Sequence, residues 1–187
     1  ARCDVLLVSV HWGDEHVAWP SPQQLSMARR LVDAGADLVA GHHAHVFQGC
    51  EPYRRGLIAY GLGNATISAL SQRVRWNGVE QDYRFVPDSA HRRGVAISVD
   101  IEPGRMLRHR LHAFFIGEDG RPVAQVAPLR LLAYRLKRAI WHLPGYVHGY
   151  RALVLFQFRV VPKVRAAARW QTWRRALGRL TRRDRAA

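Results

Sequence analysis

Three short apolar runs, each followed by a polar motif rich in glycine or histidine, limit most strongly how this chain can fold. The runs are Asp4–Val10, Asp37–Ala40 and Gly56–Tyr60. Continuous apolar runs of this length are typical of parallel strands that are covered on both faces. Ligands of open α/β sheets bind at the ends of such strands, where the loops are free of packing duty. The sequence therefore predicts an α/β fold whose polar motifs converge at one edge of a sheet.

A helix is predicted between the first two strands. Ser21 is a suitable N-cap, Pro22 fits the first turn, and apolar residues recur at helical spacing up to Gly35. We therefore expect a helix over Pro22–Ala34 that connects two parallel strands by a right-handed crossover.

The segments after the third run are expected to be a loop and a hairpin. Ser71–Arg93 is polar, rich in arginine and weakly periodic, which predicts a long surface loop that either covers the site or is simply exposed. Gly94–Ile101 and Met106–Ile116 have the composition of strands, and Pro103 and Gly104 between them favour a turn.

The net charge of +15 is unevenly distributed along the 187 residues. Residues 1–129 contain 14 Arg and no Lys against 13 Asp and Glu, whereas residues 130–187 contain 15 Arg and Lys against Asp184 alone. We therefore divide the chain into a domain at 1–128 and a basic, arginine-rich helical tail at 129–187. No stretch approaches the roughly 18 to 20 uncharged apolar residues of a membrane-spanning helix.

The chain is expected to be a fragment of a longer protein. It opens with Ala1 and runs almost at once into the first strand-like segment. A central strand needs neighbours on both sides to satisfy its backbone hydrogen bonds, so upstream sequence is expected to supply them.

Four histidines follow the first two strands directly: His11, His42, His43 and His45. Side chains at positions i and i+2 of a strand end point the same way, so His43 and His45 can share a metal site. A single histidine is more often structural, but four at strand ends favour binding of divalent metal ions. Imidazole suits Zn, Fe or Mn, and the sequence does not choose among them.

Three ordered segments resemble the bacterial capsule-synthesis (CapA) family. They are Asp4–Glu15 (DVLLVSVHWGDE), Ala34–Val46 (AGADLVAGHHAHV) and Leu57–Asn64 (LIAYGLGN). This family is linked to capsule and poly-gamma-glutamate synthesis and resembles calcineurin-like metallophosphoesterases.

The resemblance implies the C-terminal part of a metallophosphoesterase-like β-sandwich flanked by helices, with two divalent ions at the strand ends. On that pattern His11, His43 and His45 are metal ligands. Paired ions polarise a phosphoryl oxygen and lower the pKa of a bridging water, which is the chemistry of a phosphoesterase. The family's earlier motifs, which contain metal-binding aspartate, are absent from this chain. We therefore expect weak metal binding and no robust catalysis from this piece alone.

Four residues near these histidines each have two interpretations. His42, the catalytic candidate, is either a substrate-facing acid or a third imidazole behind the metal ligands. Glu15 fits the family's His-Trp-Gly-x-Glu pattern and either orients an imidazole or is a solvated carboxylate. Asn64 either caps a turn or belongs to the site, and Trp12 either packs in the core or contacts substrate. The remaining histidines considered lack paired spacing and receive no role: His91, His109, His112, His142 and His148.

Beyond Pro162 the sequence predicts a basic amphipathic helix. Its apolar face is expected to carry Ala166, Trp170, Trp173, Leu177 and Leu180. Such a helix either docks on the domain or lies on an anionic membrane surface. Nucleic acid is a less favoured partner because no DNA- or RNA-binding motif accompanies the helix.

The leading functional interpretation is a metal-dependent phosphoesterase-type protein that acts on a phosphorylated or anionic envelope polymer during capsule or poly-gamma-glutamate biosynthesis. The alternative is a non-catalytic accessory protein that helps to assemble or export an anionic polymer at the membrane. A shared fold does not separate the two. Both favour a location at the membrane or cell envelope over the cytoplasm.

Overall fold

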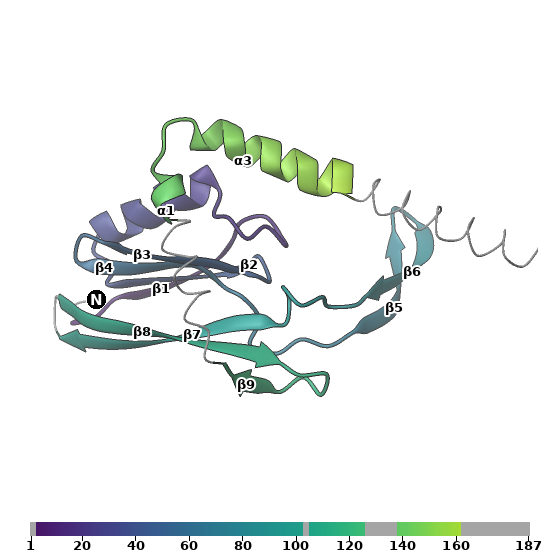
Figure 1. Ribbon diagram of the computed structural model, residues 1–187, viewed down its shortest axis with the longest axis horizontal. Coiled ribbons are helices and arrows are strands. Elements are labelled where there is room, and N and C mark those ends of the chain that lie inside the picture. Colours follow the sequence, from purple (N-terminus) through teal and green to yellow (C-terminus); the bar gives the residue numbers. More distant parts are fainter. Residues whose placement is uncertain (1–2, 103–104, 126–137, 162–187) are drawn as a thin grey trace, which may run out of the picture. The chain divides into compact units, whose positions relative to one another are not determined.

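The computed structural model describes residues 3–102, 105–125 and 138–161. The chain divides into two compact units, residues 1–146 and 147–187 (Figure 1). The basic helix predicted beyond Pro162 lies outside the described residues.

A four-stranded mixed sheet forms the centre of the first unit. Its order is β1-β2-β4-β3. The strands are β1 (Leu7–Trp12), β2 (Leu38–His43), β3 (Phe47–Tyr53) and β4 (Gly56–Leu62). β1, β2 and β4 are parallel, and β3 runs antiparallel to β4. The α/β class predicted from the three apolar runs is confirmed, whereas β3 was not predicted.

The helix α1 (Pro22–Asp33) begins where the sequence indicates. The Ser21 hydroxyl accepts a hydrogen bond from the backbone N–H of Gln24, and the Gln24 side-chain oxygen accepts one from the backbone N–H of Ser21. This reciprocal capping box satisfies two N–H groups that a helix start otherwise leaves unpaired. α1 buries Leu25, Ala28 and Val32 in the core formed with the sheet (Figure 1).

β4 is the most buried strand of the sheet, and β1 is its exposed edge. The residues Leu57–Tyr60 have no solvent exposure, because β4 lies between two other strands and contacts α1. In β1, by contrast, exposed and half-buried residues alternate, and Leu7 is 56% exposed. The prediction that this first strand is covered on both faces is therefore wrong for the described structure, because the face that carries Leu7, Ser9 and His11 is exposed.

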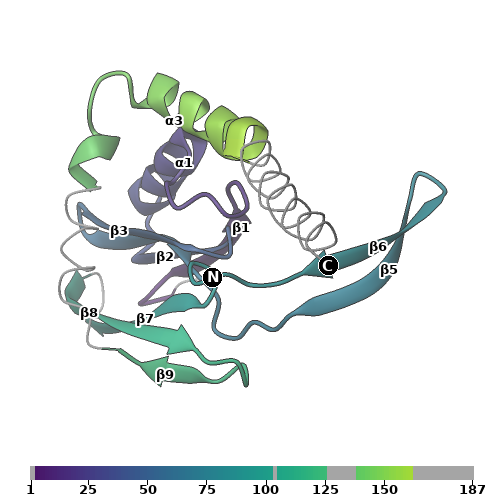
Figure 2. The same cartoon turned by 45° about the vertical axis from the view of Figure 1, so that its right-hand side comes forward.

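The predicted loop over Ser71–Arg93 contains a second hairpin instead. β5 (Leu70–Trp76) pairs antiparallel with β6 (Val79–Phe85), as Figure 2 shows. The two-residue turn, Asn77 and Gly78, has positive φ angles of 49° and 80°, which suit a tight hairpin turn. The loop prediction is wrong here because polar, cross-strand partners such as Arg73 and Asp82 give no apolar alternation.

The hairpin predicted from Gly94–Ile101 and Met106–Ile116 is confirmed. β7 (Arg93–Glu102) pairs antiparallel with β8 (Arg105–Ile116), and a short strand, β9 (Pro122–Ala124), adds to β8. β7 contacts both β3 and β4, so the three-stranded sheet packs against the four-stranded one.

The helix α3 (Tyr146–Leu155) begins at the last residue of the first unit, and all its other residues belong to the second. It continues into the short π-helical segment η1 (Phe156–Val160). Large apolar side chains are exposed on it, including Phe156 and Phe158. Within the described residues, we find no helix whose length and apolar character would let it cross a membrane.

Shortening a buried side chain of β4 is expected to destabilise the fold strongly. Ile58 is completely buried in the core, so Ile58→Ala should lower the free energy of unfolding by about 2 to 5 kcal/mol through lost apolar burial and a residual cavity. Val123→Ala, at a position 60% exposed, is the matched control and should change it by less than about 0.5 kcal/mol. Urea unfolding of the two variants measures both values, and similar losses would contradict the assignment of β4 as the core strand.

Candidate functional site

Parallel pairing of β1 with β2 brings the histidine motifs side by side. In the register of the two strands, His11 lies opposite His42 and Trp12 opposite His43. β4 pairs with the other edge of β2, so the motif that ends in Asn64 follows an adjacent strand. The predicted convergence at one edge of the sheet is confirmed.

Gly41 permits the close approach of these strands. A Cβ atom at this position would collide with the carbonyl oxygen of Tyr60 and with the indole nitrogen of Trp12. That indole N–H donates a 2.8 Å hydrogen bond to the same carbonyl. Trp12 thus packs against the core and supports the strands, which is the packing alternative of its two sequence interpretations.

Three histidines of the site have left-handed backbone conformations. The φ angles are 63° at His16, 93° at His43 and 58° at His45. This region is unfavourable for residues with a Cβ atom and costs on the order of 1–3 kcal/mol per residue, so the surrounding contacts must hold it. One such contact is the 2.8 Å hydrogen bond from the His16 backbone N–H to the Ala44 carbonyl.

Two buried glutamines support the loop between β1 and α1. The Gln24 side-chain amide donates to the Gln48 side-chain oxygen at 2.9 Å, and the Gln48 amide donates to the Val17 carbonyl at 2.9 Å. Both side chains are almost fully buried, where unpaired polar groups would be costly, so this network fixes the loop firmly. The loop carries Glu15 and His16 toward the histidine turn.

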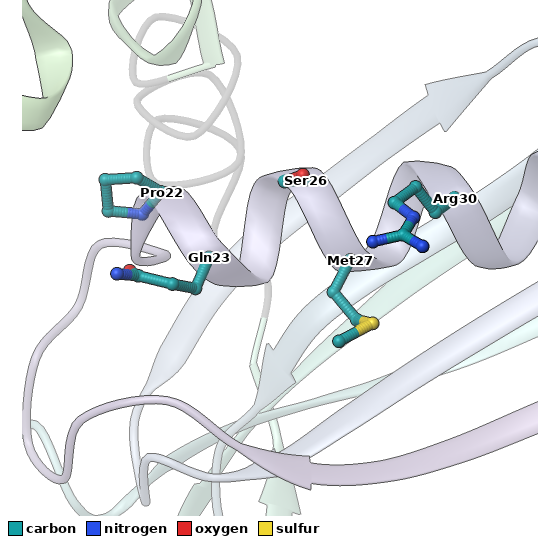
Figure 3. Close-up of a pocket in the computed structure, with 5 residues that line it drawn as sticks. All are labelled: Pro22, Gln23, Ser26, Met27 and Arg30. Carbon is teal, nitrogen blue, oxygen red and sulfur yellow. The ribbon is translucent and has the colours of Figure 1, made fainter.

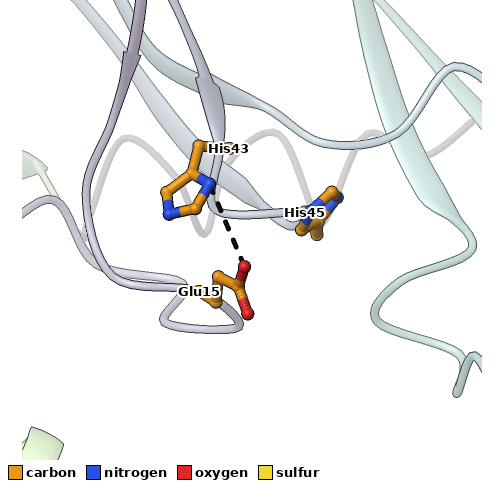
Figure 4. Close-up of side chains that lie close together, drawn as sticks. All are labelled: Glu15, His43 and His45. Atoms are coloured by element: carbon orange, nitrogen blue, oxygen red, sulfur yellow. Dashed lines mark ion pairs between the residues drawn. The ribbon is translucent and has the colours of Figure 1, made fainter. Parts of the chain in front are cut away.

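Glu15, His43 and His45 form a cluster with the donor atoms of a metal site, which we call the triad. One ligand atom from each lies within 4.8 Å of the others (Figure 4). The separation between Glu15 Oε1 and His43 Nδ1 is 4.0 Å. Two ligand atoms bound to one ion at about 2.1 Å cannot be more than about 4.2 Å apart, so only a small closure is needed. Two imidazoles and a carboxylate suit Zn, Fe or Mn.

Asn64 fixes the orientation of His45. The Asn64 amide nitrogen donates to the backbone carbonyls of His45 and His91 at 3.0 and 2.9 Å. Its side-chain oxygen must therefore accept the 2.8 Å hydrogen bond from His45 Nδ1, which places the lone pair of neutral His45 on Nε2. Metal-binding histidines commonly donate their second ring N–H in this way. Asn64 thus contacts both the backbone of this turn and a histidine of the triad.

His11 and His42 lie beside the triad. His42 Nδ1 is 3.0 Å from His11 Nδ1, and its other ring nitrogen is 3.2 Å from the Ser9 hydroxyl. The ring centroids of His11 and His43 are 4.3 Å apart. Desolvation, followed by the nearby charge of His43 and other histidines, lowers the pKa of His11. Its metal-binding role stays a prediction.

Sequence reasoning missed His16 and His91. His91 is only 8% exposed, and its Nε2 lies 2.8 Å from Nδ1 of His16. Asp88 lies behind it, with Oδ1 2.7 Å from His91 Nδ1. Burial, followed by the neighbouring His91, lowers the pKa of His16. The Asp88-x-x-His91 spacing is the one sequence signal for this arrangement, because the two histidines are far apart in the chain.

A cleft of about 360 Å³ adjoins the triad. Its lining combines polar residues of the site with residues at the base of the β5–β6 hairpin: Glu15, His16, His45, Asn64, Thr66, Ile67, Ser68, Leu70, Tyr83 and Phe85. A second hollow, of about 340 Å³, is lined entirely by α1 residues from Pro22 to Arg30 (Figure 3). Of the two, only the cleft of about 360 Å³ is lined by residues of the triad, Glu15 and His45.

A known protein family is similar to the part of the chain that carries the triad. Residues 1–68 match the model of the bacterial capsule synthesis protein family, PGA_cap. The chain is similar to this capsule synthesis protein family over residues 1–68. The matched stretch contains β1–β4, α1 and the triad, and the resemblance to the CapA family is confirmed for this part.

The relatives are much longer than this chain. It is 49% identical over 63 residues to capsule biosynthesis protein CapA of Bacillus anthracis, which covers 34% of this chain and 15% of that protein. It is 44% identical over 80 residues to PGA biosynthesis protein CapA of Bacillus subtilis (strain 168), covering 43% and 21%. A probable polyglutamine synthesis accessory protein of Mycobacterium tuberculosis is 41% identical over 111 residues, covering 58% and 29%. The matched part of the chain thus spans less than a third of the length of each of these relatives.

Removing the two histidines of the triad should abolish metal binding. We expect the chain to bind Mn²⁺ or Zn²⁺ weakly from a solution with excess ion, and the His43→Ala, His45→Ala double variant to lose this binding, because only Glu15 of the triad remains. Bound metal is measured by equilibrium dialysis against the ion followed by mass spectrometry. The control is His112→Phe, which should keep the metal. His112 lies on the β7–β8 hairpin, where its ring is hydrogen-bonded to the Ser98 hydroxyl. Equal metal content in all three proteins would contradict the triad.

The metal-free fold should lose stability as the pH falls from 7 to 5. The pKa of His11 and that of His16 are lowered from 6.5 in the folded chain, so the unfolded chain takes up protons first and acid favours unfolding. Urea unfolding with a chelator present measures this dependence. The His11→Gln, His16→Gln double variant should show a shallower loss between pH 7 and 5, and an unchanged slope would contradict the prediction.

Proposed function

We propose that this chain is the C-terminal part of a metal-dependent phosphoesterase-type protein that takes part in capsule or poly-gamma-glutamate biosynthesis. The observation that carries the proposal is the triad of Glu15, His43 and His45 at the strand ends beside the cleft. The names of the Bacillus relatives support the process, and the donor atoms of the triad support the chemistry.

Each residue of the site has a proposed part in this chemistry. His43, His45 and Glu15 would hold one divalent ion, and His11 would contribute to a second one with ligands from motifs outside this chain. Divalent ions in such a site supply Lewis-acid polarisation of a phosphoryl oxygen. Asn64 holds the His45 ring so that Nε2 is available for coordination. The residues fit Mn, Fe or Zn.

His42 is proposed as a positioning residue for His11. Both of its ring nitrogens have protein partners, His11 and the Ser9 hydroxyl. These contacts support the second of its two sequence interpretations, an imidazole behind the metal ligands, more than that of a substrate-facing acid.

The whole protein is proposed to have a metallophosphoesterase-like sandwich. The four-stranded sheet has α1 against β2 and β4, and the β7–β8 hairpin contacts β3 and β4. This layered arrangement supports the proposal for the part of the fold described here.

A non-catalytic accessory protein is the second candidate. The observation in its favour is the name of the Mycobacterium tuberculosis relative, a probable polyglutamine synthesis accessory protein. Its match of 111 residues is the longest of the three reported above. In this case the triad would hold a metal, and the protein would assist assembly or export of an anionic polymer.

Activity of the full-length protein separates the two candidates. We expect metal-dependent hydrolysis of a generic phosphodiester by the full-length protein, and a loss of at least about 100-fold in the His43→Ala, His45→Ala variant, because positions in the metal site would be lost. His112→Phe should retain the activity. No hydrolysis by the wild-type protein, together with polymer loss in cells that carry the double variant, would favour the accessory role.

The proposed partners are an anionic polymer substrate and an anionic membrane surface contacted by the basic tail. The tail residues 163–187 lie outside the described structure, so this proposal rests on their sequence. Co-sedimentation with vesicles that contain anionic lipid, with and without these residues, tests it. Binding that does not depend on anionic lipid would contradict a membrane role.

A further inference from the structure

The helix formed by α3 and η1 exposes large apolar side chains along most of its length. Five such residues lie within 147–160, and each is between 42% and 56% exposed. They are Val147, Leu155, Phe156, Phe158 and Val160. Single apolar residues are ordinary on a protein surface, whereas a contiguous group of them marks a surface that contacts a partner. This helix therefore has an uncovered apolar surface.

Helical spacing separates a sheltered side of this helix from an exposed one. Tyr150, which is 6% exposed, lies on the sheltered side, and half-buried Val154 follows it four residues later. Ala152, Phe156 and Val160 are also four residues apart, and all three are exposed. Side chains at this spacing are neighbours on one face of a helix. These three residues therefore form a line of exposed apolar side chains, which we call the apolar stripe.

The charged side chains beside the apolar stripe are both basic. Arg151 and Arg159 are exposed, and residues 146–161 contain no other Arg or Lys and no Asp or Glu. Leu155 lies four residues from each arginine, so apolar and basic side chains share the neighbouring face. An arginine can lay its apolar stem along such a surface while its guanidinium reaches a polar layer. The exposed side of the helix thus complements a surface that has anionic groups above an apolar layer, which is the structure of an anionic membrane.

We propose that α3 and η1 lie along an anionic membrane surface, with the apolar stripe inserted below the headgroups and with Arg151 and Arg159 at the lipid phosphates. Buried apolar area and attraction of basic residues to anionic lipid both favour this arrangement. Residues 163–187, which follow, contain nine Arg and Lys against Asp184 alone, so the same sign of charge continues along the chain. The choice of lipid as partner rests on the proposed function, whereas the inserted residues lie outside the tail and outside the stretch that matches the family model.

Two phenylalanines of the same helix provide a matched test. In co-sedimentation of the full chain with vesicles of equal parts phosphatidylglycerol and phosphatidylcholine, Phe156→Ser should weaken binding about tenfold, because apolar area buried in lipid is lost. Phe156→Leu should stay within about threefold of the wild type, because leucine is also apolar. Phe158 follows Val154 by four residues and so lies next to the sheltered side, and Phe158→Ser should likewise change binding less than about threefold. Equal losses in the two serine variants would contradict insertion of the apolar stripe.

A nitroxide label at position 156 measures insertion directly. The label is attached to the full chain after Phe156→Cys and Cys3→Ser, and Cys50 does not compete for it, because burial raises the pKa of the Cys50 thiol to about 12. On the same vesicles the label should become accessible to oxygen and protected from a water-soluble nickel complex. A label introduced through Val123→Cys, at a position 60% exposed on β9, is the control and should stay accessible to nickel.

The label separates this proposal from the contact proposed for the basic tail. Vesicle binding with the label at position 156 still in water would overturn insertion by α3 and η1 and leave the tail contact standing. No binding of the wild-type chain to these vesicles would overturn both. Protection of the label without vesicles, together with a concentration-dependent dimer, would assign the exposed side chains to a second copy of the chain and overturn the lipid proposal. Metal binding and hydrolysis enter none of these outcomes.

Discussion

The parallel hydrogen bonding of β1, β2 and β4 is the constraint on which the site depends. The C-terminal ends of parallel strands lie at the same end of the sheet. The motifs that follow these strands are therefore neighbours in space as a direct result of the strand pairing. The close approach requires a residue without a Cβ atom at Gly41, where Tyr60 and Trp12 leave no room. The residue before the histidine pair is thus set by the backbone of the neighbouring strand, not by the chemistry of the histidines.

The site is supported by polar groups, whereas the sheet is supported by apolar ones. α1 and β4 bury a continuous apolar core, but the loop of Glu15 and His16 is fixed from below by Gln24 and Gln48. Hydrogen bonds are directional and apolar contacts are not, so a buried amide pair can specify the position of a loop more closely than packing alone. This division lets the metal-type donor atoms remain accessible while their backbone stays ordered.

Much of the fold and half of the histidine cluster could be predicted from the sequence, for reasons that are local. The capping box at Ser21 and the His-x-His spacing of His43 and His45 both depend on residues a few positions apart. The β5–β6 hairpin had a local signal too, Asn77-Gly78, but its polar strands masked it. The exposure of β1 and the pairing of His16 with His91, 75 positions away, depend on tertiary contacts that no short pattern encodes.

The left-handed backbones of His16, His43 and His45 place backbone strain at three residues of the candidate site. Glycine or asparagine at these positions would relieve the strain and make the chain more stable, since both tolerate positive φ. A lineage that no longer needed the ligand would therefore drift toward glycine or asparagine there and keep the sheet intact. We therefore expect histidine at these three positions to persist in chains that share this fold only where the proposed site gives an advantage that outweighs the strain.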